Sequence, residues 1–225
     1  MGLTRVSTVT TDETSGPTGD LARLSEWWHD RNPGTSRELA WIVDPQDPDE
    51  VSAAVDRAID SGATLIVLHM NSDDARSRAA IALIADVPPT AVIDQERAAS
   101  DHQWMVTVAE VRDELEPLRG LPIAEAIEAL DAPGAKAAAV ALKTAAARRT
   151  PTLFDGVAGY AGALMASRDD IDARWWWLPA TSTSDPAIAT AQDVLDVHVG
   201  AHLGTQGTSS AALQAVLALL DVVDP

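Results

Sequence analysis

The sequence predicts an α/β protein, a three-layer sandwich with a mainly parallel sheet. Short apolar runs alternate with helical patterns along the chain, which is typical of strand–helix–strand units. The run from Thr64 to His69 is nearly all apolar, as expected of a strand buried on both faces of a parallel sheet. The 225 residues suffice for one substantial domain. We expect it to span residues 16–225, with the polar residues 1–15 as a flexible arm.

Composition excludes several classes of function. The net charge of −18 opposes nucleic-acid binding, which requires clustered Lys and Arg. The chain has no cysteine, so disulfides, thiolate metal ligands and cysteine nucleophiles are excluded. No apolar run approaches the roughly 20 residues that span a bilayer, and the N-terminus has no signal-peptide core. We therefore expect a cytoplasmic protein without a membrane partner.

The first predicted elements are a turn and an amphipathic helix. Residues 16–20 have the Gly, Pro and Asp content of a turn. Leu21, Leu24, Trp27 and Trp28 then recur at helical spacing, which predicts a short helix with buried aromatic side chains. Residues 29–38 are expected to form a polar loop.

The first strand–helix–strand unit is the clearest in the chain. Ala40 to Val43 is expected to form a strand. Asp47 is expected to cap a helix that has Pro48 in its first position. Apolar residues at helical spacing from Val51 to Ile59 face the core, and Gly62 ends the helix.

Ligands of open α/β sheets bind at the carboxyl ends of strands, and residues 70–74 occupy such a position. This segment holds Asp73 and Asp74 but no glycine, which makes it a poor cradle for phosphate. Arg76 and Arg78 follow within a turn. They either bind an anion or pair with the two aspartates on a solvated face, and the second interpretation is favoured.

The middle of the chain is predicted to be mostly helical. A helix over residues 79–85 is broken by Pro88 and Pro89, and a short strand is expected at residues 91–93. Three further helices are predicted at residues 101–116, 122–131 and 135–148.

The C-terminal third repeats the order strand, turn, helix. Residues 151–154 and 175–178 are predicted strands, and small residues over 157–166 suit a closely packed helix. The three consecutive tryptophans at 175–177 cannot all face one way, so at least one is expected to line a pocket or an interface. Residues 204–210 form a Gly/Thr/Ser loop before the last helix, where backbone N–H groups attract anions.

Four segments resemble the nicotinate-nucleotide:5,6-dimethylbenzimidazole phosphoribosyltransferases, which make the lower-ligand riboside of cobalamin. Residues 16–24 are similar to the family segment P-P-G-S-L-G-R-L, and residues 58–68 to G-I-D-A-G-A-D-L-L-V-L. The end of the Ala-rich helix through Gly156 resembles A-A-A-R-R-x-P-V-L-L-D-G. Residues 195–208 resemble L-D-L-G-M-R-L-G-E-G-T-G.

Two polar segments depart from the family pattern. Residues 69–74 replace a family loop rich in glycine, G-E-M-G-I-G-N-T-T, and residues 181–188 replace H-R-S-A-E-P-G-H. The chain is also about 100 residues shorter than the family, with the gap expected between the first helix and Trp41. The resemblance therefore implies a Rossmann-like sheet that is truncated relative to the family.

The family reaction needs a base near the attacking ring nitrogen. The family glutamate that acts as this base corresponds best to Gln206, whose amide only forms hydrogen bonds. Asp155, at a strand end, is the remaining carboxylate, although it could simply cap the next helix. His69 could replace the lost acid as the base. The catalytic candidates are therefore Gln206, Asp155 and His69.

The remaining candidates bind substrate. Gly204, Gly207, Thr208 and Ser209 keep the backbone features of a phosphate site. The resemblance adds a second set as substrate-binding residues, although Asp185 is also expected as a helix N-cap: Gly156, Thr181, Thr183 and Asp185. His198 and His202 have metal-chelating spacing but no third ligand, so neither a metal nor a cofactor is expected.

Two functions remain open. The chain is either a divergent phosphoribosyltransferase acting on nicotinate mononucleotide and a benzimidazole-type base, or a non-catalytic homologue that serves as a ligand-binding or partner subunit. A homodimer, or a heteromer with a related subunit, is expected. In that case exposed apolar surface at Trp27, Trp28 or Trp175 would be covered by another protomer.

Overall fold

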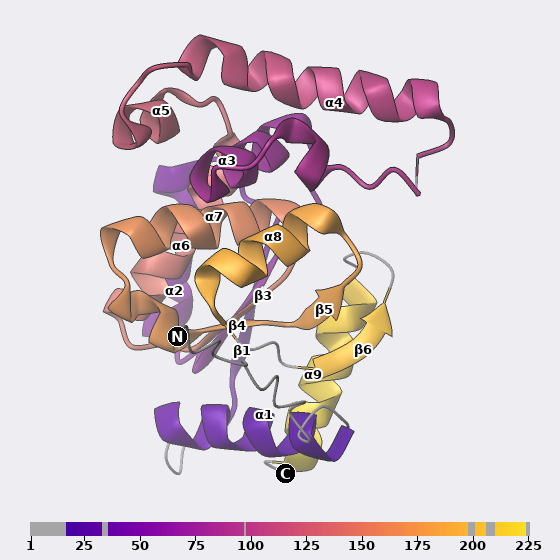
Figure 1. Ribbon diagram of the computed structural model, residues 1–225. Helices are drawn as coiled ribbons and strands as arrows, with labels where there is room; N and C mark the ends of the chain where they lie inside the picture. The colour runs from indigo at the N-terminus through magenta and orange to yellow at the C-terminus, as the bar shows by residue number, and fades with distance from the viewer. Residues whose placement is uncertain (1–16, 33–35, 97, 198–200, 206–209, 224–225) are drawn as a thin grey trace, which may run out of the picture.

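The computed structural model describes residues 17–32, 36–96, 98–197, 201–205 and 210–223. Its centre is a four-stranded parallel sheet in which neighbouring strands follow chain order (Figure 1). The strands are β1 (Leu39–Val43), β2 (Leu65–His69), β3 (Thr152–Phe154) and β4 (Trp177–Pro179). The predicted parallel sheet is confirmed, and the fully buried β2 lies inside it.

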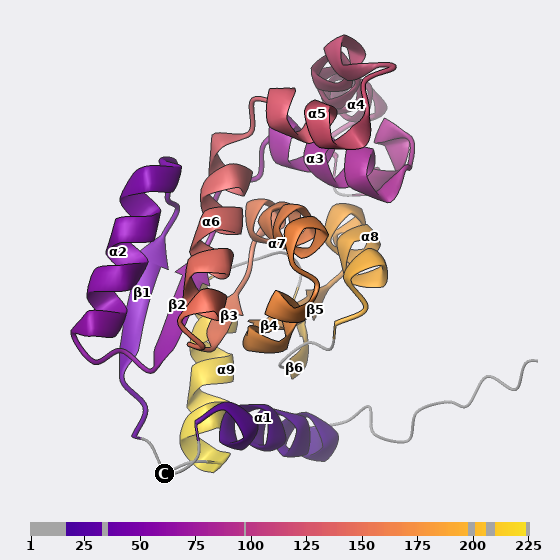
Figure 2. The ribbon, with the colours of Figure 1, turned by 90° about the vertical axis from the view of Figure 1, so that its left-hand side faces the viewer.

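One face of the sheet is covered by the helices that connect its strands (Figure 2). These are α2 (Pro48–Asp60), α6 (Pro133–Ala147) and α7 (Val157–Asp169). Ile66, Leu68 and Phe154 point from the sheet into this layer. As predicted, Asp47 caps α2, and its carboxylate accepts from the N–H groups of Asp49 and Glu50.

The opposite face is covered by α1 (Pro17–Arg31) and α9 (Ser210–Val223). Leu65, Val67 and Leu153 alternate with the residues of the first face and pack against Leu24 and Trp28 of α1. The three-layer arrangement is therefore confirmed.

Two expectations for the N-terminal segment are corrected. Residues 17–20 are helical rather than a turn, because Pro17 is compatible with a first helical position and the helix starts there. The helix also continues to Arg31, into the predicted polar loop. Trp27 and Trp28 are buried within the chain, so they form no exposed patch for a protomer to cover.

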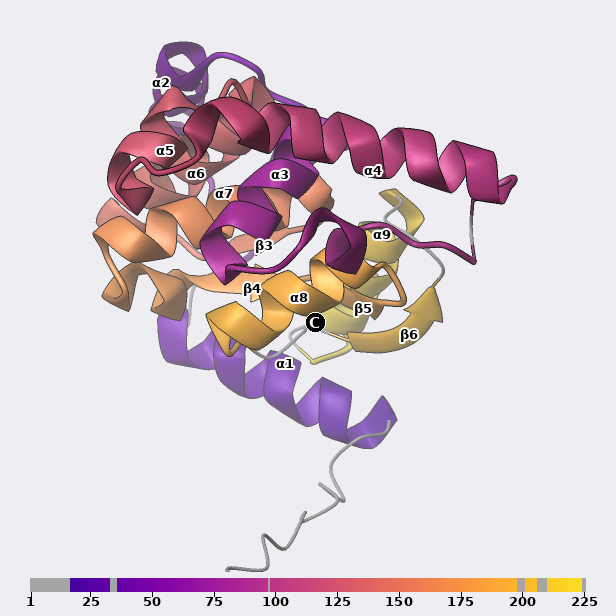
Figure 3. The same ribbon diagram turned by 45° about the horizontal axis from the view of Figure 1, so that its top comes forward.

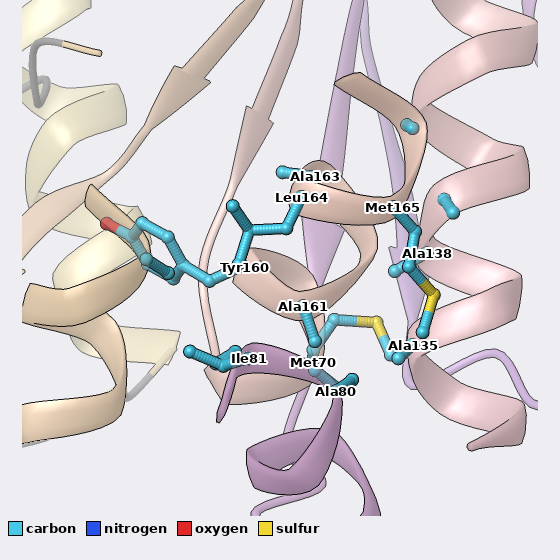
Figure 4. Packing of buried hydrophobic residues seen from close by; sticks show 14 of the residues in the cluster. Met70, Ala80, Ile81, Ala135, Ala138, Tyr160, Ala161, Ala163, Leu164 and Met165 are labelled. Carbon is cyan, nitrogen blue, oxygen red and sulfur yellow. The ribbon is translucent and has the colours of Figure 1, made fainter. Parts of the chain in front are cut away.

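Small residues bring α6 and α7 into close contact. A Cβ atom on Gly162 would lie 2.6 Å from the Cβ of Ala138 and 2.7 Å from the carbonyl oxygen of Ala135. Figure 4 shows Met70 reaching toward Ala135, and Met165 beside Ala138. The small-residue run at 157–166 therefore packs as the sequence predicts.

A helical layer lies beyond the carboxyl ends of the strands (Figure 3). It contains α3 (Ala75–Ala85), η1 (Pro89–Val92), α4 (Asp101–Leu115), η2 (Glu116–Leu118) and α5 (Ile123–Ala129). The helix α8 (Pro186–Leu195) lies beside α7 (Figure 1). The strand expected at residues 91–93 is wrong. Pro88 and Pro89 start a 3₁₀ turn instead, in which the N–H of Ala91 donates to the carbonyl of Pro88.

The C-terminal third has a second small sheet, in which β5 (Thr181–Thr183) pairs in parallel with β6 (Ala201–Thr205). Residues 181–183, for which no strand is predicted, thus form a strand, and Gly204 lies in a strand rather than in the expected loop. The strand predicted from residue 175 begins only at Trp177, after η3 (Asp172–Trp176). Trp175 is exposed, whereas Trp177 is buried and donates its indole N–H to the carbonyl of Leu142 at 3.1 Å.

Among the described residues, no helix has the length and apolar character needed to cross a membrane.

Candidate functional site

Two predicted catalytic residues meet at the carboxyl edge of the sheet. His69 ends β2, and Asp155 directly follows β3, the neighbouring parallel strand. Parallel strands end at the same edge, so His69 Nδ1 lies 2.8 Å from Asp155 Oδ1. The N–H of Met70 donates to the same oxygen at 3.3 Å. Both side chains are buried, and the pair forms an imidazole held by a carboxylate.

Burial raises the pKa of Asp155 to about 6, although the contacts with His69 and Met70 act in the opposite direction. The second oxygen, Oδ2, is buried and has no hydrogen-bond partner among the described residues. A buried carboxylate with an unmet oxygen is costly, and such groups concentrate at functional sites.

Gly156, a predicted substrate-binding residue, has a backbone role in this arrangement. Its φ is +85°, and a Cβ atom there would lie 2.0 Å from the carbonyl oxygen of Met70. Only glycine lets the segment after β3 pass this close to the segment after β2. Gly156 therefore allows the approach that brings Asp155 to His69.

Arg78 joins the segment after β2, through Asp73, to the start of α8, through Asp185. Its guanidinium donates to Asp73 at 2.7 and 2.9 Å and to Asp185 at 3.2 and 2.7 Å. A further N–H bonds the carbonyl of Val92. Burial lowers the pKa of Arg78, but the hydrogen bonds and charges of the two aspartates outweigh it and raise that pKa above its usual value. Arg78 is thus a fixed, fully engaged cation.

A cavity of about 720 Å³ opens between α3, α4 and the start of α8. Its chemistry is mixed, with an aromatic ring, aliphatic side chains, amides, several carboxylates and one arginine. It is lined by Asn71, Asp73, Asp74, Ala75, Arg78, Ile93, Asp94, Ala98, Gln103, Trp104, Thr107, Glu110, Val157, Asp185 and Ile188. The volume suits a small molecule, and the acidic lining favours a neutral or N–H-bearing ligand over an anion.

The predicted residues are distributed unevenly around this cavity. Asp185 lines it and, as expected, caps α8, since its carboxylate accepts from the N–H groups of Ala187 and Ile188. Thr183 lies beside Asp185 and accepts from its N–H at 3.0 Å. His69 and Asp155 do not line the cavity, but Asn71 and Val157, each two residues away along the chain, do.

Other predicted residues lie elsewhere. Gly204 and Thr181 are in the strands of the second sheet. Outside the described residues lie His198, Gln206, Gly207, Thr208 and Ser209. In the described part of the chain, no three metal-binding side chains form a cluster.

The expected pairing of the arginines is only partly correct. Arg76 contacts Glu114 and Asp131, and Asp74 caps α3 instead of binding an arginine. Arg78 does bind Asp73, but it is buried rather than on a solvated face. Its pairing with Asp185, 107 residues away, was not predicted because no local spacing signals it.

The chain is similar to known proteins along most of its length. The model of the DBI_PRT phosphoribosyltransferase family matches residues 51–222. A nicotinate-nucleotide–dimethylbenzimidazole phosphoribosyltransferase of Mycobacterium tuberculosis is 34% identical over 184 residues, which cover 75% of this chain and 51% of the relative. One of Corynebacterium glutamicum is 27% identical over 222 residues, covering 91% and 62%. The chain thus spans about half to three fifths of the length of these relatives.

The fold is also similar to the crystal structure of CobT from Thermus thermophilus. The TM-score is 0.65 at 22% sequence identity, and the match covers 79% of this chain and 57% of that one. Because the family model matches most of the chain, this protein belongs to the DBI_PRT phosphoribosyltransferase family.

Proposed function

We propose that the chain performs the reaction for which its relatives are named, the transfer of ribosyl phosphate from nicotinate nucleotide to dimethylbenzimidazole or a similar base. The observation that carries this proposal is the His69–Asp155 pair at the carboxyl edge of the sheet. A ring nitrogen attacks more readily when its proton is removed. His69 Nε2 accepts that proton, while Asp155 holds Nδ1–H and stabilises the imidazolium.

The adjacent cavity supports binding of the aromatic base. Trp104, Ile93 and Ile188 offer apolar contacts to a planar ring. Carboxylates along the same wall, such as Glu110, accept hydrogen bonds from ring N–H groups. The indole Nε1 of Trp104 is buried and lacks a hydrogen-bond partner among the described residues, so an acceptor on the ligand would satisfy it.

The test combines turnover and binding. Product formation from nicotinate mononucleotide and dimethylbenzimidazole is followed by chromatography, and each ligand is titrated calorimetrically. His69→Asn is expected to lower kcat by at least about 100-fold with little change in base affinity. His29→Asn removes an exposed histidine from α1 and serves as the control, with unchanged turnover. A folded wild-type protein that binds neither ligand and forms no product would contradict the proposal.

A second candidate function, a non-catalytic partner subunit, is favoured by β1. Leu39, Trp41 and Val43 share one face of this edge strand and are 42, 39 and 56% exposed. Exposed apolar faces of this kind are typical of contacts with another chain. In addition, Arg78, the cation lining the cavity, is engaged by two aspartates and offers little to a phosphate.

The two candidates are separated by the oligomeric state of a Trp41→Glu variant. If β1 forms a subunit contact, this substitution is expected to convert an oligomer to a monomer in light scattering. The exposed Met105→Glu on α4 is the matched control and is expected to leave the mass unchanged. A wild-type protein that is monomeric over a wide concentration range would count against a self-association role.

A further inference from the structure

A second cavity lies at the opposite edge of the sheet from the His69–Asp155 pair. It has a volume of about 700 Å³ and borders α1, η3 and the start of β4. Figure 1 shows α1 at the bottom of the molecule, with α3 and α4 at the top. The two cavities share no lining residue. Nothing in the proposed transfer reaction uses this second cavity.

Aromatic and basic side chains dominate its wall. Arg31, at the end of α1, lies between two tryptophans, with its guanidinium carbon 5.2 Å from the Trp27 ring centre and 4.0 Å from that of Trp175. Its Nη1 donates to the carbonyl of Trp27 at 2.8 Å, and its Nε to the carbonyl of Trp175. Arg174 donates to the carbonyls of Ile171 and Leu195.

Unlike Arg78 in the first cavity, neither of these two arginines forms an ion pair with a carboxylate in the described part of the chain. Burial lowers the pKa of Arg31 to about 10, and the charge of Asp30 opposes this only in part. Asp172 and Asp196 also line the cavity, but neither bonds to Arg31 or Arg174 within the described residues. Arg31 thus keeps a partly desolvated positive charge that forms no ion pair with a carboxylate among the described residues.

Two further features point to a ligand. The Trp27 side chain is 92% buried, since its exposed fraction is 8%, and its indole Nε1 has no hydrogen-bond partner among the described residues. An unmet buried donor is unfavourable, and an acceptor at this wall would satisfy it. Trp175 is 54% exposed, with Arg31 against one face of its ring, so the ring edge beside Arg31 can contact a planar group.

We propose that this second cavity binds a small planar aromatic anion, that is, an aromatic ring bearing a carboxylate or a phosphate. The anionic group pairs with the guanidinium groups of Arg31 and Arg174, and an oxygen of it accepts from Trp27. The ring packs against the exposed edge of Trp175. This site is separate from the proposed transfer reaction, so a failure of either proposal does not affect the other.

The test uses the intact chain and simple probes. Benzoate and phenyl phosphate are titrated calorimetrically, with benzamide as the neutral analogue and inorganic phosphate as the anion without a ring. Binding of benzoate or phenyl phosphate at least about tenfold tighter than both analogues is expected. The preferred anion distinguishes a carboxylate ligand from a phosphate ligand. If neither benzoate nor phenyl phosphate binds more tightly than both benzamide and inorganic phosphate, the proposal is overturned.

Two variants locate the binding. Arg31→Met keeps an extended side chain between the tryptophans but removes the charge. It is expected to weaken binding of the preferred probe at least about tenfold. Trp27→Phe keeps a ring but removes the N–H. In an NMR spectrum, the indole N–H signal that this variant lacks is the signal of Trp27. That signal is expected to shift in the wild-type protein when the probe is added.

Arg112→Met on α4 is the control, because Arg112 is exposed and pairs only with its neighbour Asp113 among the described residues. It is expected to bind the probe as the wild type does. An unchanged affinity in Arg31→Met, or a Trp27 indole signal that does not move at saturation, would overturn the assignment of the site. Circular dichroism of each variant confirms that it is folded before its affinity is compared.

Discussion

Arg78 Nη2 lies 2.7 Å from Asp185 Oδ2, in a buried contact that ties the start of α3 to the start of α8. Asp185 also accepts the first N–H groups of α8, so one carboxylate serves both the cap and the ion pair. Arg78 holds Asp73 with its other edge. This contact therefore sets the spacing between two helices that line the first cavity.

Arg78→Met is expected to destabilise the protein by about 3–5 kcal/mol, because it leaves Asp185 buried without its cation. The free energy of unfolding is measured in urea. The double variant Arg78→Met/Asp185→Asn is expected to be more stable than the sum of the two single variants predicts, since asparagine still caps α8. Arg112→Met breaks an exposed pair and is expected to cost less than about 0.5 kcal/mol. If the destabilisations of Arg78→Met and Asp185→Asn simply added in the double variant, a direct coupling between the two residues would be refuted.

Asp155 is expected to make stability depend on pH. Its pKa rises from an ordinary 3.8 to about 6 on folding, so the folded state holds the proton more tightly than the unfolded state. The contribution of Asp155 to the stability of the folded state is therefore fully present below about pH 4, and it is lost as the pH rises through 6. The difference corresponds to about 3 kcal/mol of destabilisation at neutral pH.

The free energy of unfolding of Asp155→Asn is consequently expected to equal that of the wild type near pH 4 and to exceed it by about 2 kcal/mol at pH 8. It is measured by urea unfolding at each pH. The exposed Asp193→Asn on α8 changes the net charge equally and serves as the control. If Asp155→Asn and wild type gave parallel curves of stability against pH, the buried-carboxylate interpretation would fail. A stabilised variant with lower turnover would indicate that Asp155 is retained for function.

The sequence predicts the layers of this fold well because they depend on local signals. The buried run of β2, the Asp47 and Asp185 caps, and the small residues of α7 are each visible in a short window. The short strand expected at 91–93 failed because the two preceding prolines start a 3₁₀ turn. Local patterns also could not reveal that residues 181–183 pair with β6, which lies about 20 residues further along the chain.

The site was harder to predict. The sequence indicates His69 and Asp155 as two separate candidates, whereas their contact follows from the parallel pairing of β2 and β3. The Arg78–Asp185 contact and the second cavity join segments more than 100 residues apart, so neither leaves a local pattern. The role of Gly156 depends on the path of Met70, which only the folded chain defines.

The first cavity gives a prediction for the aromatic base. Trp104→Phe removes the unmet indole N–H and keeps an aromatic ring, so it is expected to weaken binding of dimethylbenzimidazole by about threefold to tenfold. Affinity is measured by calorimetry. Trp175→Phe changes an exposed tryptophan of the second cavity and is expected to leave base affinity unchanged. If Trp175→Phe had the larger effect, the base would belong in the second cavity instead.

Two glycines with positive φ give a matched test of how the site is built. Gly156 and Gly120 have φ values of +85° and +80°, so alanine is strained at both. A Cβ atom at Gly120 meets nothing within 4 Å, whereas at Gly156 it would lie 2.0 Å from the Met70 carbonyl oxygen. Gly120→Ala is therefore expected to cost only the backbone strain, about 1 kcal/mol.

Gly156→Ala is expected to cost at least about 2 kcal/mol more than Gly120→Ala in urea unfolding, because the segments after β2 and β3 must separate. That separation would also loosen the contact between His69 and Asp155. The His69 ring signals in NMR are therefore expected to shift in Gly156→Ala and to stay in place in Gly120→Ala. If the two alanine variants lost the same free energy of unfolding and the His69 signals did not move, the close approach at Gly156 would not be what holds His69 and Asp155 together.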